Sequence, residues 1–509
     1  MPEGRDRVSS VCAECGAPVT FEMGTPQVTC AHCDAGLVVG QGARLIRLGC
    51  PRCGGNFYYI DGSLCGRCPY CEASLFALTE DRVLRYVVPP AAEAPAEAAG
   101  AELRLLPFWH LGGLLYAWLV GAQIKIEEDP AAMQAQGGGA DAEPVPTTTR
   151  RDSGPQKVWA GRVVDMSLPD PATLALGVTS LRLRAAVFPL EPFAQQHESL
   201  GAVVPATLDQ REAREQLLGR AVFYSTDQGL TRVDCRRIDF VAESLSLYYY
   251  PFWVLRREDG GFAVWDAVSG EPEALSSPAD PPASSATAIF DDLQLVELSC
   301  SACGAELPAG NHSSVLPCRG CGRFWRVSRQ GLQPFEARFA RPRQRGSGQP
   351  VWLPFWQVPV QVGYSGKQAS RAGDLITVLG VLRPPGEAPP PDAPLCYYTP
   401  AFGAMHAPRV DHAARDLTRS QPALEAGEPG AGELYNCFYG EDDALRLGYV
   451  TWILVVPGTV PHRLRSLRIQ AGAPQLWYIP FDQDAGGREL VNLVTGVRYD
   501  RAAFRGVRH

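Results

Sequence analysis

Twelve of the 16 cysteines stand in close pairs, and the pairs repeat with one spacing. Two thiolates three positions apart can bind one metal ion from a tight turn, and two such turns complete a tetrahedron. The spacing C-x2-C-x14-C-x2-C is typical of a four-cysteine zinc site. We therefore predict three structural Zn2+ ions, with iron as the alternative metal that thiolate tetrahedra accept. The predicted ligand sets are Cys12, Cys15, Cys30 and Cys33; Cys50, Cys53, Cys68 and Cys71; and Cys300, Cys303, Cys318 and Cys321.

The second set contains a fifth cysteine. In the segment CPRCGGNFYYIDGSLCGRCPYC, which covers residues 50–71, the second pair could be Cys65 with Cys68 or Cys68 with Cys71. The fourteen-residue gap of the other two sets selects Cys68 and Cys71. Cys65 is therefore predicted not to bind the metal.

The cysteine pairs also indicate the local backbone. Glycine follows the second cysteine in CAECGA, CPRCGG, CSACGA and CRGCGR, and glycine accepts the positive φ that such a turn requires. These segments resemble the zinc-ribbon superfamily, including ribbons of the transcription factor IIB type. The resemblance implies small hairpin domains that need their metal to fold, and it implies no particular activity. A four-thiolate set leaves no open coordination position, so we expect structural rather than catalytic zinc.

Arginines gather around the third set of cysteines. Phe324 and Trp325 stand among them, and arginines with aromatic side chains can bind phosphates and stack on bases. The same residues could bind an acidic protein surface or form a solvated face. The formal net charge of -8 argues against the whole chain being a nucleic-acid binder. The candidate patch consists of Arg319, Arg323, Arg326 and Arg329.

A second repeated motif contains Pro-Phe, usually followed by Trp. It occurs as LLPFWHLGG from Leu105, YYYPFWVLRR from Tyr248, VWLPFWQVPV from Val351 and LWYIPFDQD from Leu476. Aromatic residues after a proline suit the start of a buried strand. We infer two duplicated β-rich domains, each opened by one copy and closed by another, whose middles pair AAVFPLEPF with LCYYTPAFGAM. The array resembles bacterial zinc-ribbon proteins in which similar strand motifs follow N-terminal ribbons.

The predicted fold is mainly β or α+β, with several domains. Helices are expected at 208–221 and 409–420. Segments rich in Ala, Pro, Gly and Ser bury too little surface to become ordered, so we read them as linkers or loops. The expected units are zinc ribbons at 8–40, 46–80 and 296–335; linkers at 89–102 and 276–295; β-rich domains at 103–275 and 351–503; and a disordered loop at 127–157.

The segment from Leu105 to Ile124 contains no Lys, Arg, Asp or Glu and is long enough to cross a bilayer. Its counterpart in the second β-rich domain alternates like a strand, so we expect a strand and no membrane association. No signal-peptide pattern precedes the first cysteines, and paired cysteines suit a reducing compartment. These features predict a cytoplasmic protein.

The best catalytic candidates lie in AMHAPRVDHAARD, where His406, Asp411, His412 and Asp416 could bind a metal. The spacing matches no zinc-protease helix motif, and no nucleotide-binding or serine-hydrolase motif occurs. Cys235, Cys396 and Cys437 are expected to be buried structural thiols. We therefore expect a non-catalytic scaffold or adaptor that binds other proteins. The alternatives are a nucleic-acid-associated factor and a metalloenzyme using His406 and His412.

Overall fold

A computed structural model defines the fold. The first predicted ligand set, Cys12 to Cys33, lies outside the residues that the structure describes, as do Arg329 and His406. The described residues are 7–11, 18–22, 27–29, 36–38, 45–60, 65–78, 83–122, 124–128, 148–152, 154–179, 181, 190–220, 230–275, 293–307, 313–328, 331–346, 348, 350–384, 389–402, 407–428, 430, 432–483 and 489–500.

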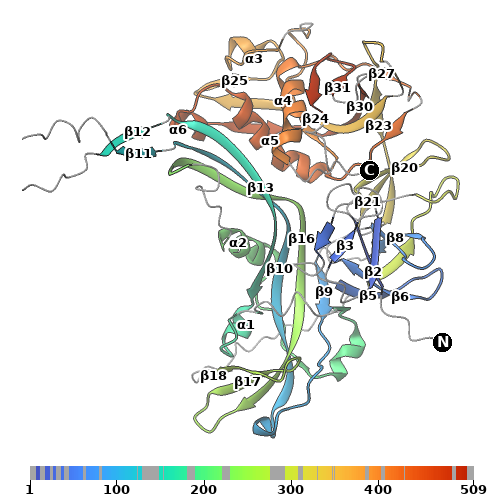
Figure 1. The fold of residues 1–509 in the computed structure, drawn as a ribbon, viewed down its shortest axis with the longest axis vertical. Helices are drawn as coiled ribbons and strands as arrows, with labels where there is room; N and C mark the ends of the chain where they lie inside the picture. Colours follow the sequence, from blue (N-terminus) through green and yellow to red (C-terminus); the bar gives the residue numbers. More distant parts are fainter. Residues whose placement is uncertain are drawn as a thin grey trace, which may run out of the picture.

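The chain is rich in strands, as predicted, and most of them belong to two large sheets with small ribbons beside them (Figure 1). Along its main path the first sheet is antiparallel, in the order β13 (Gln156–Pro169), β10 (Glu102–Ala122), β16 (Arg232–Arg256), β17 (Phe262–Asp266) and β18 (Pro272–Leu275). Two short strands join it in parallel, β9 (Leu84–Val87) and β15 (Ala202–Val203).

The second sheet has the order β25 (Lys367–Ala369), β24 (Val351–Tyr364), β30 (Gln475–Gln483), β23 (Ala337–Ala340) and β27 (Ala426–Gly427). Its remaining strands pair with members of this path. They are β26 (Cys396–Pro400), β28 (Glu433–Leu434), β29 (Arg468–Ala471), β31 (Glu489–Asn492) and β32 (Arg498–Asp500).

The apolar segment that is long enough for a membrane span is the strand β10. Its side chains are buried along most of its length, on both faces, which explains a nearly continuous apolar run. The strand prediction for Leu105–Ile124 is therefore confirmed over Leu105–Ala122. Within the described part of the chain, every helix is too short or too polar to cross a bilayer.

The opening and closing PFW strands pair in the same register in both sheets. Each opening proline lies opposite a tyrosine, and each closing proline lies opposite the residue two positions before the opening proline. The pairs are Pro107–Tyr249 and Leu105–Pro251 in the first sheet, and Pro354–Tyr478 and Trp352–Pro480 in the second.

The agreement extends to the other strands of the two sheets. In each sheet, the strand that follows a ribbon runs parallel to the closing strand. This strand is β9 in the first sheet and β23 in the second, and both pair with the closing strand at the same distance from its proline. A short parallel strand, β15 or β28, lies beside the opening strand, and a third strand ends in a proline opposite the motif phenylalanine. The matched pairs are Tyr249–Val87 and Tyr478–Phe339; Leu105–Val203 and Trp352–Leu434; and Phe108–Pro169 and Phe355–Pro400.

This register corrects one predicted correspondence. The segment LCYYTPAF contains β26, whose Pro400 is equivalent to Pro169 at the end of β13. The end of AAVFPLEPF instead forms β14 (Glu191–Pro192), which pairs with β9 as β27 pairs with β23. The two proline-containing stretches look alike because both sit where a strand ends, although they belong to different strands.

Six α-helices occur among the described residues. Those predicted at 208–221 and 409–420 are present as α2 (Gln210–Arg220) and α4 (Ala407–Ser420). The longest, α5 (Glu441–Val455), was missed because its valines, isoleucine and aromatic residues favour strands and most of its surface is buried. The others are α1 (Pro171–Leu174), α3 (Asp374–Thr377) and α6 (Pro461–Arg465).

The far ends of β10, β13 and β16 pack against α5, so the two sheets share one hydrophobic core. Trp118 stacks on Tyr449, with ring centroids 6.1 Å apart. The ammonium of Lys157 on β13 donates to the carbonyl oxygens of Ile453 and Val456 at the end of α5. These contacts tie the two predicted β-rich domains together.

Two segments that are predicted as a linker and a loop contain short regular elements. The predicted linker 89–102 contains a short 3-10 helix, Ala96–Ala98, and the backbone N–H groups of Ala91 and Ala92 donate to the carbonyl of Ala267. Backbone hydrogen bonds to a neighbouring turn can order a segment that has few apolar side chains. At the ends of the predicted disordered loop 127–157, β11 (Ile124–Glu128) pairs with β12 (Thr148–Asp152), whereas residues 129–147 lie outside the described residues.

Candidate metal centres

Two of the three predicted ribbons are described around their cysteines. The second ribbon contains β5 (Leu45–Gly49), β6 (Asn56–Ile60), β7 (Cys65–Arg67) and β8 (Ser74–Leu78). The third contains β19 (Gln294–Glu297), β20 (Val315–Pro317), β21 (Phe324–Ser328) and β22 (Gly331–Phe335). In each ribbon, both cysteine pairs lie in turns between these short strands.

The structure brings eight of the twelve predicted ligands together in two groups of four. Within each group the sulfur atoms lie within 4.8 Å of one another. The first group is Cys50, Cys53, Cys68 and Cys71, and the second is Cys300, Cys303, Cys318 and Cys321. Each group could hold one metal ion.

The sulfur–sulfur distances fit a tetrahedral metal. They are 3.7 Å for Cys50–Cys71 and for Cys53–Cys68, 3.6 Å for Cys300–Cys321 and 3.5 Å for Cys303–Cys318. Zinc–sulfur bonds of about 2.3 Å place the corners of a tetrahedron about 3.8 Å apart. A disulfide would bring two sulfurs to about 2.05 Å. The donor sets therefore fit Zn2+, or another thiolate-binding metal of the same geometry.

The four cysteine pairs of these two ribbons are held by the same backbone turn. The first cysteine's carbonyl accepts from the N–H four positions later, and its own N–H donates to the carbonyl five positions later. The residue after the second cysteine has a positive φ in each case, namely Gly54, Glu72, Gly304 and Gly322. Three of these residues are glycine, as predicted, whereas Glu72 adopts the same conformation with a side chain.

The thiols of the third ribbon influence one another strongly. Burial raises the pKa of the Cys300 thiol, but hydrogen bonds from the backbone N–H groups of Ala302 and Cys303 lower it to about 6. A hydrogen bond from the backbone of Ala305 lowers the pKa of Cys303, but contacts with the thiols of Cys318 and Cys300 raise it to about 12. Four adjacent thiols cannot all ionise by themselves, and a bound cation removes that obstacle.

Cys65 lies outside the ligand group, as predicted. Its side chain is fully buried in a core with Phe76, Leu316 and Trp325, and burial raises the pKa of its thiol. Val315 holds the equivalent position in the third ribbon, fifteen residues after the first cysteine. Cys65 is thus a packing residue. Cys235, Cys396 and Cys437 are also buried.

The second and third ribbons pack directly on each other. Strand β19 pairs with β8 of the second ribbon, and the two ribbons share the core that contains Cys65. The guanidinium of Arg52, between the ligands Cys50 and Cys53, lies 2.6 Å from the carboxylate of Glu297 and 3.8 Å from that of Glu306. Nothing in the separate ribbon patterns predicts this pairing, because it joins segments about 220 residues apart.

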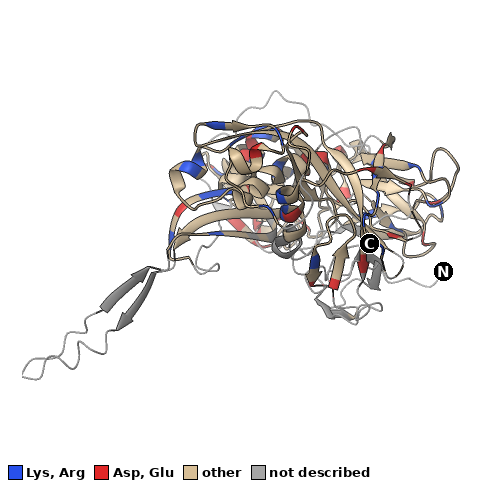
Figure 2. Ribbon diagram, turned by 90° about the horizontal axis from the view of Figure 1, so that it is seen from above, with Lys and Arg blue, Asp and Glu red and all other residues tan. Residues whose placement is uncertain are grey.

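The third ribbon is also fixed to the second sheet. The backbone N–H of Ser314 donates to the carbonyl oxygen of Cys437 at 2.7 Å. Arg326 lies 2.7 Å from the carboxylate of Glu441, the first residue of α5. This ion pair occupies one arginine of the predicted patch, whereas Arg319 and Arg323 are exposed. In the view of Figure 2, basic and acidic residues are interspersed over the described elements.

Strand β6 of the second ribbon connects to a strand of the predicted first ribbon. Strand β1 (Arg7–Val11) lies parallel to β6, with Val8 opposite Tyr58, and pairs on its other side with β2 (Pro18–Glu22). The ribbon strands therefore form two separate rows of pairings, β2-β1-β6-β5 and β19-β8-β7. The first row joins strands of the first and second ribbons, and the second row, with a shared core, joins the second and third.

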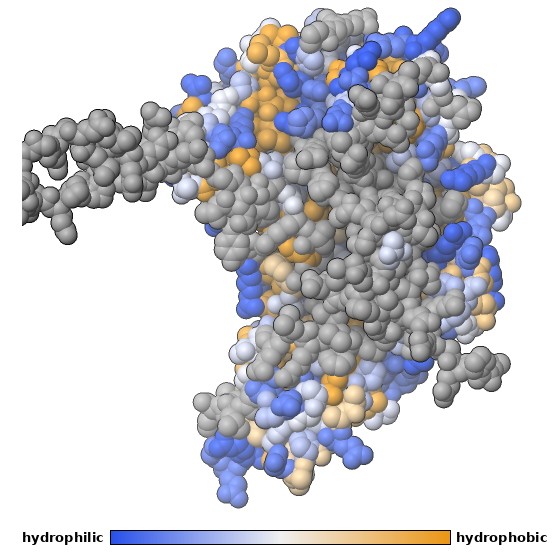
Figure 3. All heavy atoms as spheres, in the orientation of Figure 1, coloured by the Kyte–Doolittle hydropathy of each residue, from blue (hydrophilic) through white to orange (hydrophobic). Residues whose placement is uncertain are grey.

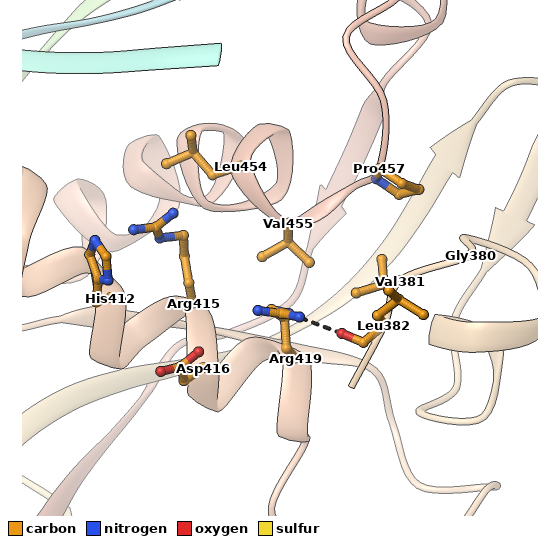
Figure 4. A pocket seen from close by; sticks show the side chains of 10 residues that line it. All are labelled: Gly380, Val381, Leu382, His412, Arg415, Asp416, Arg419, Leu454, Val455 and Pro457. Atoms are coloured by element: carbon orange, nitrogen blue, oxygen red, sulfur yellow. Dashed lines mark hydrogen bonds between the residues drawn. The ribbon is translucent and has the colours of Figure 1, made fainter. Parts of the chain in front are cut away.

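The histidine cluster is only partly described. His412 lies on α4 beside a pocket that Arg415, Asp416 and Arg419 also line (Figure 4). The spacing of these residues on α4 could have been read from the sequence as one helical face. The apolar wall opposite them could not, because loop 380–382 and the end of α5 supply it.

Comparisons of the chain with protein-family models, with curated proteins and with solved structures find no match.

Proposed function

We propose that the chain is a zinc-ribbon protein that holds three structural Zn2+ ions, one in each cysteine set. The observation that carries this proposal is the pair of four-sulfur groups whose edges of 3.5 to 3.7 Å suit tetrahedral zinc. Zinc would act by fixing the turns and the short hairpins around them, which are too small to build cores of their own. Closed four-thiolate sites keep no position for substrate.

Metal analysis of the full chain tests this proposal. Wild-type protein is expected to contain three zinc ions, and Cys68→Ser is expected to lose one of them. Cys65→Ser is the matched control, because it changes a buried cysteine of the same ribbon and should keep all three. Loss of metal in Cys65→Ser but not in Cys68→Ser would overturn the ligand assignment. Iron instead of zinc in the purified protein would show that the alternative metal occupies the sites.

We also propose that the two sheets are copies of one ancestral unit consisting of a ribbon, its exit strand and a PFW sheet. The shared registers of the opening, closing and exit strands support this origin. A matched turn supports it as well: Asp266 and Asn492 each accept two backbone N–H bonds through Oδ1, and each turn ends in a glycine at φ 76°.

We propose that the assembled array works as a non-catalytic scaffold or adaptor for other proteins in a bacterial cytoplasm. The β8–β19 pairing joins the second ribbon to the third, and the Ser314–Cys437 contact joins the third ribbon to the second sheet unit. Surfaces of distant segments therefore keep fixed positions. Affinity purification from the native organism, with mass spectrometry of co-purified proteins, tests this role. The disruptive variant Cys68→Ser should lose the partners that the wild type retains. Recovery of the wild-type protein alone would overturn the scaffold role.

A nucleic-acid-associated factor is the second candidate, supported by the exposed Arg319 and Arg323. It requires DNA or RNA binding that weakens as salt rises. The double variant Arg319→Ala/Arg323→Ala would then bind more weakly, and this pair leaves the Arg326–Glu441 ion pair intact. No binding at low salt would exclude this candidate. The metalloenzyme candidate requires a fourth metal ion that is lost in His406→Ala/His412→Ala.

A further inference from the structure

A pocket of about 370 Å³ lies beside the second sheet, between α4, the end of α5 and the loop 380–382. Small-molecule sites typically measure roughly 300–1,000 Å³. The walls of this pocket differ in their chemistry. One wall is a polar face of α4, and the other is mainly apolar (Figure 4). The polar wall consists of His412, Arg415, Asp416 and Arg419, and the other of Gly380, Val381, Leu382, Leu454, Val455 and Pro457.

The polar wall is cationic. His412, Arg415 and Arg419 follow the spacing i, i+3 and i+7, which places them on one face of α4. The Nε atom of Arg419 donates to the carbonyl oxygen of Leu382 at 3.0 Å, and this bond holds the guanidinium across the pocket. Among the described residues, Arg419 forms no ion pair within 4.0 Å. Asp416 shares this wall, and its carboxylate interacts electrostatically with Arg419, Arg415 and His412.

Part of the apolar wall is exposed, whereas Val381 and Val455 are buried. Leu382 is 79% exposed, and Ile376 of the nearby helix α3 is 52% exposed. Figure 3 shows apolar surface at the top of the molecule, in the region where Figure 1 places α3 and α4. An apolar group bound along this wall would be removed from water, which is favourable. A metal ion suits the pocket poorly, because two guanidinium groups stand beside His412.

We propose that this pocket binds a small amphiphilic anion, with its acidic group on Arg415 and Arg419 and its short apolar chain along Leu382, Leu454 and Pro457. The guanidinium group pairs equally with a carboxylate or a phosphate, often through two hydrogen bonds. The shared ligand chemistry is therefore a carboxylate or phosphate monoester that carries a hydrocarbon chain. This inference is independent of the metal sites and of the scaffold role.

Isothermal titration of the full-length protein with octanoate, octyl phosphate and 1-octanol tests the proposal. At least one of the two anions is expected to bind, and the stronger one identifies the acidic group. 1-Octanol should bind at least tenfold more weakly. Arg419→Gln and Arg415→Gln should each weaken anion binding about tenfold, because one charged hydrogen-bonding partner is lost.

Arg211→Gln is the matched control, since it removes an arginine from the exposed face of α2 and leaves the pocket unchanged. It should bind the anion as the wild-type protein does. Far-UV circular dichroism of each variant checks that the helices are intact. The proposal is overturned if neither anion binds, if 1-octanol binds as tightly as the anions, or if both pocket variants bind like the control.

Discussion

At the scale of single residues, the metal turns are the most regular feature of the chain. Four turns share the same two backbone hydrogen bonds and a positive φ after the second cysteine. Glycine adopts this conformation without strain, whereas a residue with a Cβ is disfavoured by roughly 1 to 2 kcal/mol. Glu72, at φ 59°, is therefore the one position of these four turns that holds a residue other than the favoured glycine.

Replacing this residue should stabilise the second ribbon. Glu72→Gly relieves the strain of the left-handed conformation and is expected to raise the free energy of unfolding by up to about 1 kcal/mol. Urea unfolding of the zinc-loaded protein measures the change. Glu72→Ala keeps a Cβ and is the control that should gain little. A loss of stability in Glu72→Gly would show that the side chain of Glu72 makes a contribution larger than the backbone strain.

Lys157 gives the protein a pH-dependent contribution to stability. Burial lowers the pKa of its ammonium from the ordinary 10.5 to about 8. Between these two values the unfolded chain binds the proton and the folded chain has released it, so stability rises with pH across this interval. Urea unfolding between pH 7.5 and 10.5 should show this rise in the wild type and a smaller one in Lys157→Met. Parallel curves for the two proteins would contradict the shift.

At the scale of secondary-structure elements, helix α5 joins the two sheets. It packs against β26 of the second sheet on one side and against β16 of the first on the other. Gly448 permits the close approach to β26, because a Cβ at that position would overlap the ring of Tyr397. The hydroxyl of Tyr397 also donates to the carbonyl oxygen of Ala444, one turn earlier in α5.

Two helix glycines should respond oppositely to alanine. Gly448→Ala gains up to about 1 kcal/mol of helix propensity but meets Tyr397, and overpacking costs about 1–3 kcal/mol, so a net loss of stability is expected. Gly219 lies in α2 with no atom within 4 Å of a Cβ, so Gly219→Ala should be neutral or stabilising. Thermal unfolding of both variants tests the contrast, and equal effects would show that α5 shifts to accommodate the methyl group.

At the scale of the whole molecule, the ribbons connect the sheets through paired strands and a common core. The second ribbon contributes β8, the third contributes β19, and the Arg52–Glu297 ion pair spans them. The ligands Cys300 and Cys318 are themselves members of the shared core. Loss of the metal should therefore loosen the contact between ribbons as well as the turns.

Hydrogen exchange measures this coupling. After chelation, the amides of 65–78 and 294–328 should exchange faster, because the turns that anchor β7, β8 and β20 lose their metal. The amides of 107–121 in β10 should change less, since this strand is buried between β13 and β16. Unchanged exchange in both ribbons after complete metal removal would show that the shared core suffices without metal.

The sequence by itself determined the local features whose cause is local. Cysteine spacing specifies the two four-sulfur groups and leaves Cys65 aside, because a ligand set is read from neighbouring turns. The PFW segments indicate strands. Helix α4 shows through its polar and apolar periodicity, and α2 through its strong helix formers Gln, Arg, Glu, Ala and Leu. Helix α5 was missed, since burial on nearly every side removes that periodicity and its β-branched residues favour strands.

Only the tertiary structure decided how these parts meet. The shared strand registers, the docking of β19 on β8, the core between α5 and β16, and the pocket beside α4 each join segments far apart in the chain. Such contacts depend on shape and backbone pairing that no single segment encodes. The order within 89–102 has the same kind of cause, because its backbone hydrogen bonds go to the turn at Ala267. The spacing of residues thus specifies the local metal-binding chemistry, whereas the arrangement of the sheets and ribbons follows from the burial of distant surfaces against one another.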